Sequence, residues 1–267
     1  MKILVTGASG FIGGAFLRRF AGRENLRLYG AGRGERPDLP PEVNWRTLSM
    51  GDLTRWDITP DVVIHAAGRT SPWGSDRDYY RDNVTTDEQA IDFCRRRGYP
   101  RLVLLSSAAV YYRFAHRYRL TENTAPGEPF TCAYGRSKFI AEQRVAGYEG
   151  EKTVLRPCAV FGPGDKLLFP PLLNAAKKRQ LWCLRSPNGP ARSELMHVDA
   201  LCDYLLQAAT RPALQPCYNL SSAQPVEVNA LLQEVLQTLH LPPVTRTLNI
   251  RTALALAGAL EWLWRRL

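Results

Sequence analysis

The feature that most constrains the fold is a glycine-rich turn near the N-terminus. Residues 2–6 form a short apolar segment typical of a β-strand, and residues 11–20 have the apolar spacing of a helix. Gly7, Gly10 and Gly13 lie between the strand and the first helical turn. They allow a tight turn, a close backbone approach to a pyrophosphate, and close packing of helix on strand. The helix N-terminus supplies free N–H groups for that anion, so the turn predicts a dinucleotide site.

Short apolar segments alternate with helical ones up to residue 157. Strands are expected at residues 26–31, 43–48, 61–66, 102–106 and 152–156, and helices at 77–97 and 134–146. Continuous apolar strands separated by helices indicate a parallel sheet that is covered on both faces. The prediction is an α/β fold with a doubly wound parallel sheet, whose ligands bind at the carboxyl ends of the strands.

The composition of the chain changes after Pro157, where Pro and Gly residues recur. Helices are expected at residues 167–180, 199–209 and 228–239. We therefore expect a dinucleotide-binding domain over residues 1–157 and a smaller substrate lobe over most of residues 158–267, with some segments returning to the first domain.

The charge of the chain does not by itself indicate its partner. Lys and Arg number 35 against 25 Asp and Glu, a net charge of +10. The basic residues are scattered in short clusters, without zinc-finger spacing, a basic-leucine heptad or an aromatic RNA-binding signature. We expect a small-molecule substrate and no nucleic-acid partner.

Compartment and metal binding are judged from the cysteines and the apolar runs. The six cysteines are far apart with no C-x-x-C pair, which predicts no metal site and suits a reducing cytoplasm. The first strand begins at residue 2, which leaves no room for a signal peptide. The longest apolar run, residues 253–260, is shorter than the roughly 20 residues that a membrane-spanning helix needs.

The C-terminal segment, residues 248–267, has leucines at helical spacing and ends in Trp262, Trp264, Arg265 and Arg266. An amphipathic helix of this kind either covers the substrate lobe or lies at the inner face of a membrane. Both interpretations stay open.

The loop after the second expected strand indicates which nucleotide is bound. A carboxylate there favours NAD, and an arginine favours the 2′-phosphate of NADP. Residues 30–36 have no acid at the turn, whereas Arg33, with Arg36 as a second candidate, offers charge-assisted hydrogen bonds. NADP is therefore favoured over NAD, the alternative being that Arg33 is a solvated loop residue.

Tyr134 and Lys138 are four residues apart and share one face of an expected helix. An ammonium beside a phenol stabilises the phenolate, which suits the tyrosine to proton transfer with a carbonyl or an alcohol. Ser107 ends the fifth expected strand, at the sheet edge where ligands bind, and its hydroxyl is placed to orient a substrate oxygen.

Together these segments resemble the extended short-chain dehydrogenases/reductases, the NAD(P)-dependent epimerase/dehydratase superfamily. The likeness covers almost the whole chain and rests on motifs in the expected order, at residues 6–13, 51–54, 65–68, 83–84, 106–111, 134–138, 156–164 and 197–199. It implies a Rossmann domain, a homodimer formed through helices near residues 87–97 and 134–148, and a catalytic trio of Ser107, Tyr134 and Lys138.

The resemblance also extends the set of expected cofactor-binding residues, with Asp52 holding the adenine amino group. The full set is Gly7, Ser9, Gly10, Phe11, Ile12, Gly13, Arg33, Asp52, Leu53, Ala66, Ala67, Gly68, Tyr134, Lys138, Pro157 and Val160. By the same comparison His65 lies beside the nucleotide. His197 is more readily interpreted as a helix cap or core partner than as an acid/base.

Departures from the family pattern narrow the expected chemistry. Ala108 and Ala109 stand where dehydratases have an acidic pair, and the loop after the second strand lacks the acid usual in nucleotide-sugar epimerases. Residues 69–74 resemble the Pro-Trp stretch of the bacterial branch near β-hydroxysteroid dehydrogenases. The pocket is expected to have an aromatic wall formed by Trp73, Tyr79, Tyr112 and Phe169. The expected substrate-binding residues are Trp73, Ser107, Tyr112 and Phe169.

The predicted function is that of an NAD(P)-dependent oxidoreductase acting on CH–OH groups. It would reduce a ketone with NADPH, or run the reverse reaction, on an apolar or mixed substrate whose identity stays open. A nucleotide-sugar epimerase and a non-catalytic NADP-binding sensor are the alternatives.

Overall fold

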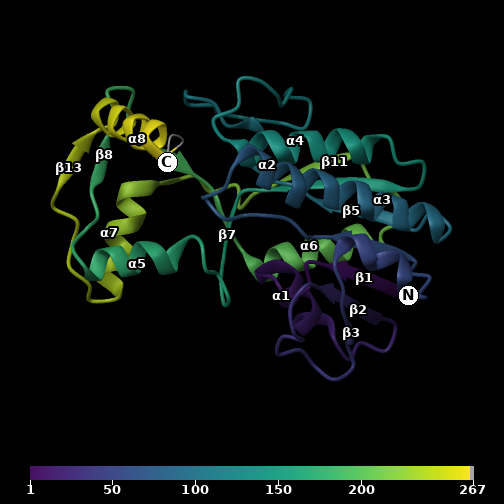
Figure 1. Cartoon of the computed structure of the whole chain (residues 1–267). Helices are drawn as coiled ribbons and strands as arrows, with labels where there is room; N and C mark the ends of the chain where they lie inside the picture. The colour runs from purple at the N-terminus through teal and green to yellow at the C-terminus, as the bar shows by residue number, and fades with distance from the viewer. Residues whose placement is uncertain (265–267) are drawn as a thin grey trace. The chain divides into compact units, whose positions relative to one another are not determined.

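Seven parallel strands form the central sheet of the computed structural model, which describes residues 1–264 (Figure 1). Their order is β11-β6-β5-β4-β1-β2-β3, and every neighbouring pair is parallel. The predicted doubly wound fold is confirmed. The strands are β1 (Lys2–Thr6), β2 (Arg27–Gly32), β3 (Asn44–Thr47), β4 (Val62–His65), β5 (Arg101–Leu105), β6 (Lys152–Pro157) and β11 (Cys217–Leu220).

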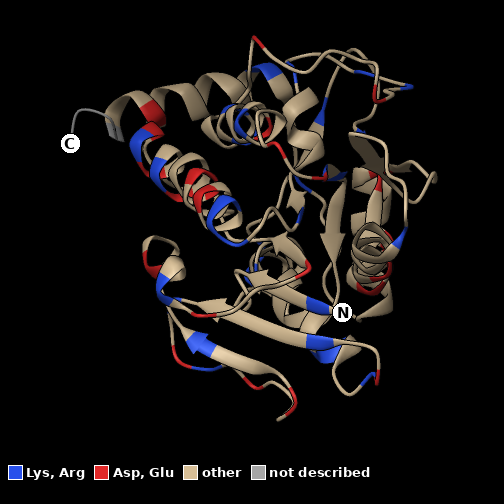
Figure 2. Cartoon of the chain, turned by 90° about the vertical axis from the view of Figure 1, so that its right-hand side faces the viewer, with Lys and Arg blue, Asp and Glu red and all other residues tan. Residues whose placement is uncertain are grey.

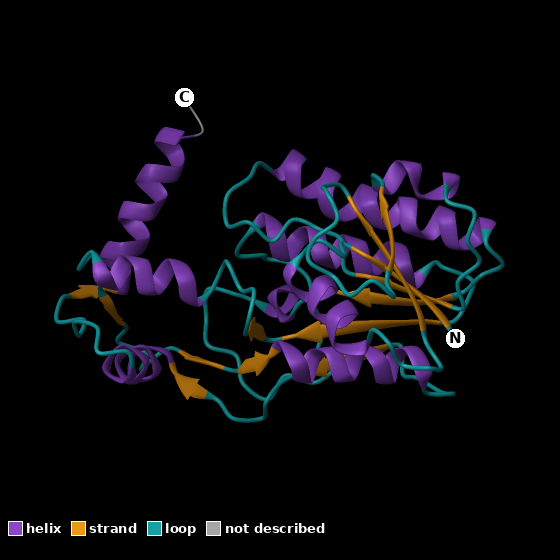
Figure 3. Cartoon of the chain, turned by 90° about the horizontal axis from the view of Figure 1, so that it is seen from below, coloured by secondary structure: helices purple, strands orange, loops and turns teal. Residues whose placement is uncertain are grey.

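Helices cover both faces of this sheet, as Figure 3 shows from below. α1 (Phe11–Phe20) and α6 (Val198–Thr210) pack on one face, and α3 (Thr86–Arg96) and α4 (Ala133–Ala146) pack on the other. Successive strand residues divide between the two layers: Ile3 and Val5 join the α1/α6 core, whereas Leu4 joins the opposite one. The central strands β1, β4 and β5 are mainly apolar because both of their faces are buried.

The helix expected at residues 77–97 is interrupted. It consists of α2 (Asp76–Tyr79), a π-helical stretch η2 (Tyr80–Thr85), and α3. Ser75 caps its N-terminus, because its hydroxyl accepts from the backbone N–H of Asp78 while the Asp78 carboxylate accepts from the backbone N–H of Ser75. Single π-helical turns inside α-helices are frequent at functional sites. Two 3₁₀ turns, η1 (Met50–Arg55) and η3 (Ala108–Tyr111), follow β3 and β5.

The chain divides into two compact units. The first contains residues 1–164 and 196–221, so it extends beyond residue 157 through β7 (Ala159–Phe161), which pairs with β10 (Leu195–His197). Residues 196–221 return to this unit and supply α6 and the edge strand β11.

The second unit contains residues 165–195 and those from Ser222 onward. Its short strands pair as β9 with β12 and β8 with β13, and none of them was expected from the sequence. Its elements are α5 (Phe169–Lys177), β8 (Cys183–Arg185), β9 (Arg192–Ser193), β12 (Val226–Glu227), α7 (Val228–Thr238), β13 (Thr247–Asn249) and α8 (Ile250–Trp264).

Basic and acidic residues are interspersed along the helices and loops in Figure 2. Arg265 and Arg266, expected at a membrane-leaning end, lie outside the described residues. Over residues 1–264, no helix has the length and apolar character needed to cross a bilayer. The same residues contain no cluster of three or more His, Cys, Asp or Glu side chains able to hold a metal ion.

Candidate active site

The glycine turn has no room for side chains. Gly7 has φ +65°, and a Cβ there would lie 2.6 Å from the backbone nitrogen of Ala67 on the neighbouring strand–loop segment. A Cβ on Gly13 would lie 2.6 Å from the carbonyl oxygen of Gly7. Gly10 is the N-cap of α1 and has no side chain to satisfy the free N–H groups, and the first turn of α1 has no acid. The helix N-terminus therefore offers its donors and its positive end to an anion.

A groove of about 420 Å³ opens at the carboxyl ends of β1, β2 and β4. Among the expected cofactor-binding residues, those that line it are Gly7, Ser9, Gly10, Arg33, Ala66, Ala67 and Gly68. The bare glycine turn and the free helix N-terminus fit the diphosphate of a dinucleotide. The other lining residues are Ala31, Gly32, Leu48, Ser49, Met50, Gly51, Arg81, Asp82, Thr85, Thr86 and Gln89.

The two arginines of the β2 loop are placed differently. Arg33 is exposed and lines the groove. The Arg36 guanidinium instead donates to the backbone carbonyls of Leu39 and Pro40, at 3.2 and 2.7 Å, and is not part of the groove lining. The expectation that Arg36 assists Arg33 is therefore corrected, because the loop uses Arg36 to satisfy its own carbonyls.

Asp52 follows the groove residues Ser49, Met50 and Gly51 without itself lining the groove, and it already has two partners. Its carboxylate accepts from Ser49 Oγ at 2.6 Å and from Arg55 at 2.9 Å. The side chain of Leu53 is fully buried in the α3/α4 layer, so only its backbone can face a nucleotide.

The remaining expected cofactor residues lie outside the groove lining. Phe11, Ile12 and Val160 pack against the α1/α6 core, and Pro157 is buried at the end of β6. Gly13 is buried in the first turn of α1.

The three expected catalytic residues are held by β5, η3 and α4. Ser107 caps η3, its Oγ accepting from the backbone N–H of Ala109 at 3.1 Å. Lys138 is 4% exposed, and its Nζ donates to the carbonyl oxygen of Leu105 at 2.9 Å. The Tyr134 phenol is hydrogen-bonded to Ser107 and is half-buried. The structure thus brings all three together where β5 ends.

Burial and the neighbouring polar groups have opposite effects on the pKa values of Tyr134 and Lys138. Burial raises the pKa of the Tyr134 phenol above its ordinary value, and the hydrogen bond with Ser107 opposes that rise. Burial lowers the pKa of the Lys138 ammonium, while the carboxylates of Asp87 and Glu142 oppose the fall. In this state the phenol carries its proton at neutral pH.

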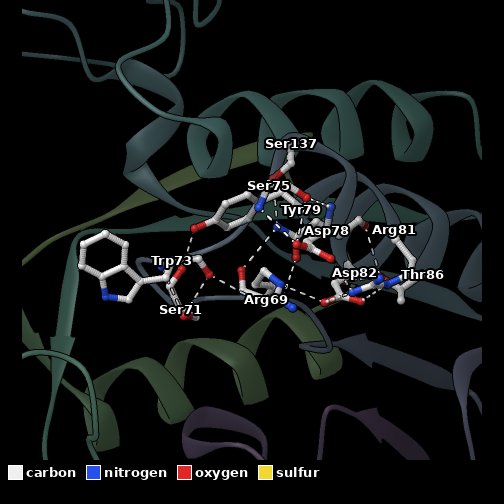
Figure 4. A network of polar contacts seen from close by, with 11 residues as sticks. Arg69, Ser71, Trp73, Ser75, Asp78, Tyr79, Arg81, Asp82, Thr86 and Ser137 are labelled. Atoms are coloured by element: carbon white, nitrogen blue, oxygen red, sulfur yellow. Dashed lines mark hydrogen bonds and ion pairs between the residues drawn. The ribbon is translucent and has the colours of Figure 1, made fainter. Parts of the chain in front are cut away.

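A polar network borders the groove next to Gly68 (Figure 4). The buried carboxylate of Asp82 accepts from Arg69 Nε at 2.9 Å and from Arg81 Nε at 2.9 Å. Hydrogen bonds from Arg81, and secondarily from Arg69, hold the pKa of Asp82 below its ordinary value, against the effect of burial. Arg69 also donates to the backbone carbonyl of Trp73, which fixes the loop that carries this tryptophan.

The expected substrate-binding aromatics are not equally placed. Trp73 is 76% exposed and Tyr112 is 49% exposed, both in the first unit. Tyr79 is buried, and its ring centroid lies 6.4 Å from that of Tyr134. Phe169 is the first residue of α5 and belongs to the second unit.

The two histidines that the sequence singled out have structural partners. His197 is the N-cap of α6, and its Nδ1 accepts from the backbone N–H of Asp199 at 3.2 Å. The interpretation of His197 as a cap is confirmed. His65 is buried between Thr6 and Asp87 at the end of β4.

Arg81 is one of the groove residues that sequence reasoning missed. A regular helix over residues 77–97 gives no reason to place it at the cofactor edge. The π-helical stretch η2 changes which side chains share a face, and Arg81 and Asp82 then line the groove. The signal available in the sequence was the motif at Asn83, two residues further on.

Comparison with known proteins places this fold and site in one family. The family model described as the NAD-dependent epimerase/dehydratase family matches residues 3–221. The chain belongs to this family. The resemblance inferred from the motifs is thereby confirmed.

Curated relatives of the family cover most of the chain. A 2-alkyl-3-oxoalkanoate reductase from Stenotrophomonas maltophilia is 29% identical over 283 residues, 99% of this chain and 83% of the relative. A farnesyl-dihydroquinoline-oxide ketoreductase from Stigmatella aurantiaca is 28% identical, over 100% of this chain and 82% of that protein. A sterol-4-alpha-carboxylate 3-dehydrogenase from Schizosaccharomyces pombe is 35% identical over 67% of this chain and 56% of its own length. These names agree with the expected class, oxidoreductases acting on hydroxyl or keto groups.

Solved structures of the family share the fold. The Bordetella bronchiseptica enzyme WbmH in complex with NAD⁺ superposes with a TM-score of 0.79 at 19% identity, over 93% of this chain and 85% of its own. A UDP-glucuronic acid 4-epimerase from Bacillus cereus in complex with NAD also gives 0.79 at 19% identity, over 93% and 88%. Likeness at this identity concerns the fold alone.

Proposed function

We propose that this protein reduces the keto group of a substrate with apolar substituents, using NADPH, and that it also runs the reverse alcohol oxidation. The observation that carries the proposal is the arrangement at the end of β5. There the protonated phenol of Tyr134 lies close to Ser107, one helical turn before the buried Lys138. A phenol held beside a hydroxyl is suited to protonating a developing alkoxide.

Each of the three side chains has a part in the proton transfer. Ser107 orients the substrate oxygen, Tyr134 Oη donates its proton to that oxygen, and the Lys138 ammonium stabilises the phenolate that remains. When bound, the reduced nicotinamide supplies the hydride. The glycine turn, Ser9 and Lys138 would hold the dinucleotide, and Arg33 would bind the 2′-phosphate that distinguishes NADP from NAD.

The substrate class is inferred from the relatives and from the surroundings of Tyr134. Two relatives that extend over nearly all of the chain are named for the reduction of 3-oxoalkanoates and of an isoprenoid-substituted ketone. Tyr79 packs near the Tyr134 ring, and Tyr112 and Trp73 add aromatic surface on the first unit. We therefore favour a 3-oxoacyl substrate with alkyl chains over a sugar nucleotide.

The test follows NADPH oxidation at 340 nm with a series of 2-alkyl-3-oxoalkanoic acids and esters of increasing chain length. Turnover should rise with chain length, and Tyr134→Phe should reduce kcat by about 10²- to 10⁴-fold while NADPH still binds. Tyr118→Phe, at an exposed tyrosine, is the matched control and should retain full activity.

The other outcomes identify the alternatives. Epimer formation from a sugar nucleotide without net redox change would indicate an epimerase. NADPH binding without turnover of either substrate class would indicate a sensor. Full turnover in Tyr134→Phe would overturn the mechanism.

We also infer a peripheral membrane contact through α8. Its leucines and Trp262 are more than half exposed, and Glu261 and Arg251 are the only charged residues between Ile250 and Trp264. A helix of this composition suits the lipid interface. Co-sedimentation with anionic vesicles should fall when Leu256 and Leu260 are both replaced by Ser. Equal sedimentation of this variant and the wild type would reject the contact.

A homodimer through α3 and α4 is proposed by analogy with the family. Light scattering on the eluting protein should give about twice the 30.0 kDa chain mass. A monomer mass at micromolar concentration would reject it.

A further inference from the structure

A buried histidine–carboxylate pair lies at the end of β4, in the same interior region as the proposed catalytic lysine. His65 ends β4 and Asp87 is in the first turn of α3, and each is 1% exposed. His65 Nε2 lies 2.6 Å from Asp87 Oδ1, and His65 Nδ1 lies 2.7 Å from Thr6 Oγ1. The imidazole is thus held from both sides, by the strand that precedes the glycine turn and by α3.

The buried Asp87 carboxylate has few polar partners to replace the hydrogen bonds that it would make with water. Among residues 1–264, its carboxylate oxygens have no hydrogen-bond partner beyond this contact with His65. A buried carboxylate is strongly unfavourable unless a nearby cation compensates it. A cation in the same interior region would offset this cost.

Lys138 is a buried cation at the end of the neighbouring strand. Nζ donates to the carbonyl oxygen of Leu105, and the preceding β5 residue, Leu104, is paired with His65 across the sheet. The ammonium and the His65–Asp87 pair thus lie over the ends of two neighbouring strands. Asp87 is the carboxylate that most raises the pKa of Lys138, against the lowering by burial.

The second carboxylate near Lys138 is already engaged. Glu142 accepts from Arg156 through both oxygens, at 2.9 and 2.5 Å, and from Ser106 at 2.5 Å. Its charge is neutralised by this buried pairing. Asp87 instead has His65 as its partner, which is a counter-charge only when the imidazole is protonated, and its negative charge also acts on Lys138.

We propose that Asp87, held in place by His65, is a positioning residue that keeps Lys138 protonated and thereby sets the pH range in which Tyr134 transfers its proton. The expected effect on turnover rests on the proposed function, whereas the expected effect on the protonation of Lys138 does not. The charged groups that act on Lys138 are Asp87 from α3 and Glu142 from α4, while His65 from β4 contacts Asp87 and Tyr134 lies one helical turn before Lys138 on α4.

These charges determine the direction in which the pKa of Lys138 moves when Asp87 is replaced. Without the Asp87 charge, Lys138 loses its proton at lower pH, because burial is then opposed by Glu142 alone. The phenol of Tyr134 next to an uncharged amine ionises at higher pH. Alcohol oxidation needs the phenolate, so its rise in rate with pH should move to higher pH.

The first experiment measures the lysine directly in the ligand-free protein. The chain has only six lysines, so [¹⁵Nζ]-lysine spectra are simple, and Lys138→Arg identifies the Lys138 signal. In Asp87→Asn the titration midpoint of Lys138 should fall by about one pH unit or more. Asp92→Asn is the matched control, because Asp92 is exposed on the same helix and paired with Arg96. An unchanged Lys138 midpoint in folded Asp87→Asn would overturn the proposal.

The second experiment follows the pH profile of alcohol oxidation. The acid limb should shift to higher pH in Asp87→Asn and stay in place in Asp92→Asn, whereas a merely structural loss would lower the rate at all pH values alike. If the wild type has no turnover, the proposed function fails, and the lysine titration alone decides this inference.

Folding of the variants is controlled separately. Asp87→Thr removes the same charge with a smaller side chain if Asp87→Asn does not fold. Should neither fold, Lys138→Met tests the coupling from the other side. It should be less stable than the wild type at neutral pH and should lose less stability as the pH falls, because protonation of the Asp87 carboxyl in the folded state relieves the buried charge that has lost its ammonium. The same loss of stability on acidification in both proteins would contradict the coupling.

Discussion

At the scale of single residues, Arg33 and Arg36 show how neighbours in sequence acquire different roles. Both follow β2, and both have the charge that a 2′-phosphate requires. Arg36 is used by its own loop, whose carbonyl groups it satisfies, whereas Arg33 lines the groove. The sequence places both arginines in the same loop, and only the loop conformation separates the two.

Arg33→Ser should therefore weaken NADPH selectively. Loss of a charge-assisted hydrogen bond costs about 1.5–3 kcal/mol, so the KM for NADPH should rise roughly 10- to 100-fold. The KM for NADH should barely change, and Arg36→Ser should leave both values near those of the wild type. Steady-state kinetics with the two cofactors makes the comparison. An equal loss with NADPH and NADH would show that Arg33 does not contact the 2′-phosphate.

At the scale of elements, the β1–turn–α1 unit is specified almost completely by local sequence. Gly13 lies in the first turn of α1, against the carbonyl oxygen of Gly7. In an ordinary helix, Gly→Ala stabilises by up to about 1 kcal/mol. Here the contact of 2.6 Å with backbone atoms reverses the sign, because neither partner is a flexible side chain.

Gly13→Ala should destabilise the protein by about 1–3 kcal/mol, as expected for overpacking, and should weaken dinucleotide binding. Gly34→Ala is the control, because a Cβ there meets nothing within 4 Å. Urea denaturation measures the stabilities, and quenching of tryptophan fluorescence measures binding. A Gly13→Ala protein as stable as the wild type would mean that α1 can move away from the turn.

At the scale of the whole molecule, the first unit has two apolar layers, and each contains one buried thiol. Cys202 lies in the α1/α6 layer and Cys94 in the α3/α4 layer. Burial raises the pKa of each thiol to about 12. Cys132 is exposed at the N-cap of α4. The reactivity of these three thiols therefore distinguishes surface exposure in the folded protein from unfolding of the first unit.

At pH 8, a thiol with a pKa of about 12 is only about 10⁻⁴ ionised, and the thiolate is the reactive form. Iodoacetamide labelling followed by peptide mass spectrometry should modify Cys132 in the native protein. Cys94 and Cys202 should react together, and only as denaturant unfolds the chain. Native labelling of one buried thiol without the other would show that the two layers open independently.

The sequence by itself determined the elements whose signals are local. The glycine turn, the apolar strands on either side of it, and the Tyr134–Lys138 spacing depend on residues within one or two turns of one another. The ordered motifs then indicated the family, because several of them follow strand ends where the parallel sheet gathers its ligand-binding groups.

Only the tertiary structure decided the features that depend on distant segments. Residues 217–220 form β11 at the edge of the main sheet. The π-helical turn places Arg81 in the groove lining, and Asp87 contacts His65 in the interior of the first unit. Each joins residues that are far apart in the chain or that a regular helix would place elsewhere. Local propensity and periodicity report on a residue's own segment, whereas burial, charge balance and the partners of a buried carboxylate are set by the packing of segments against one another.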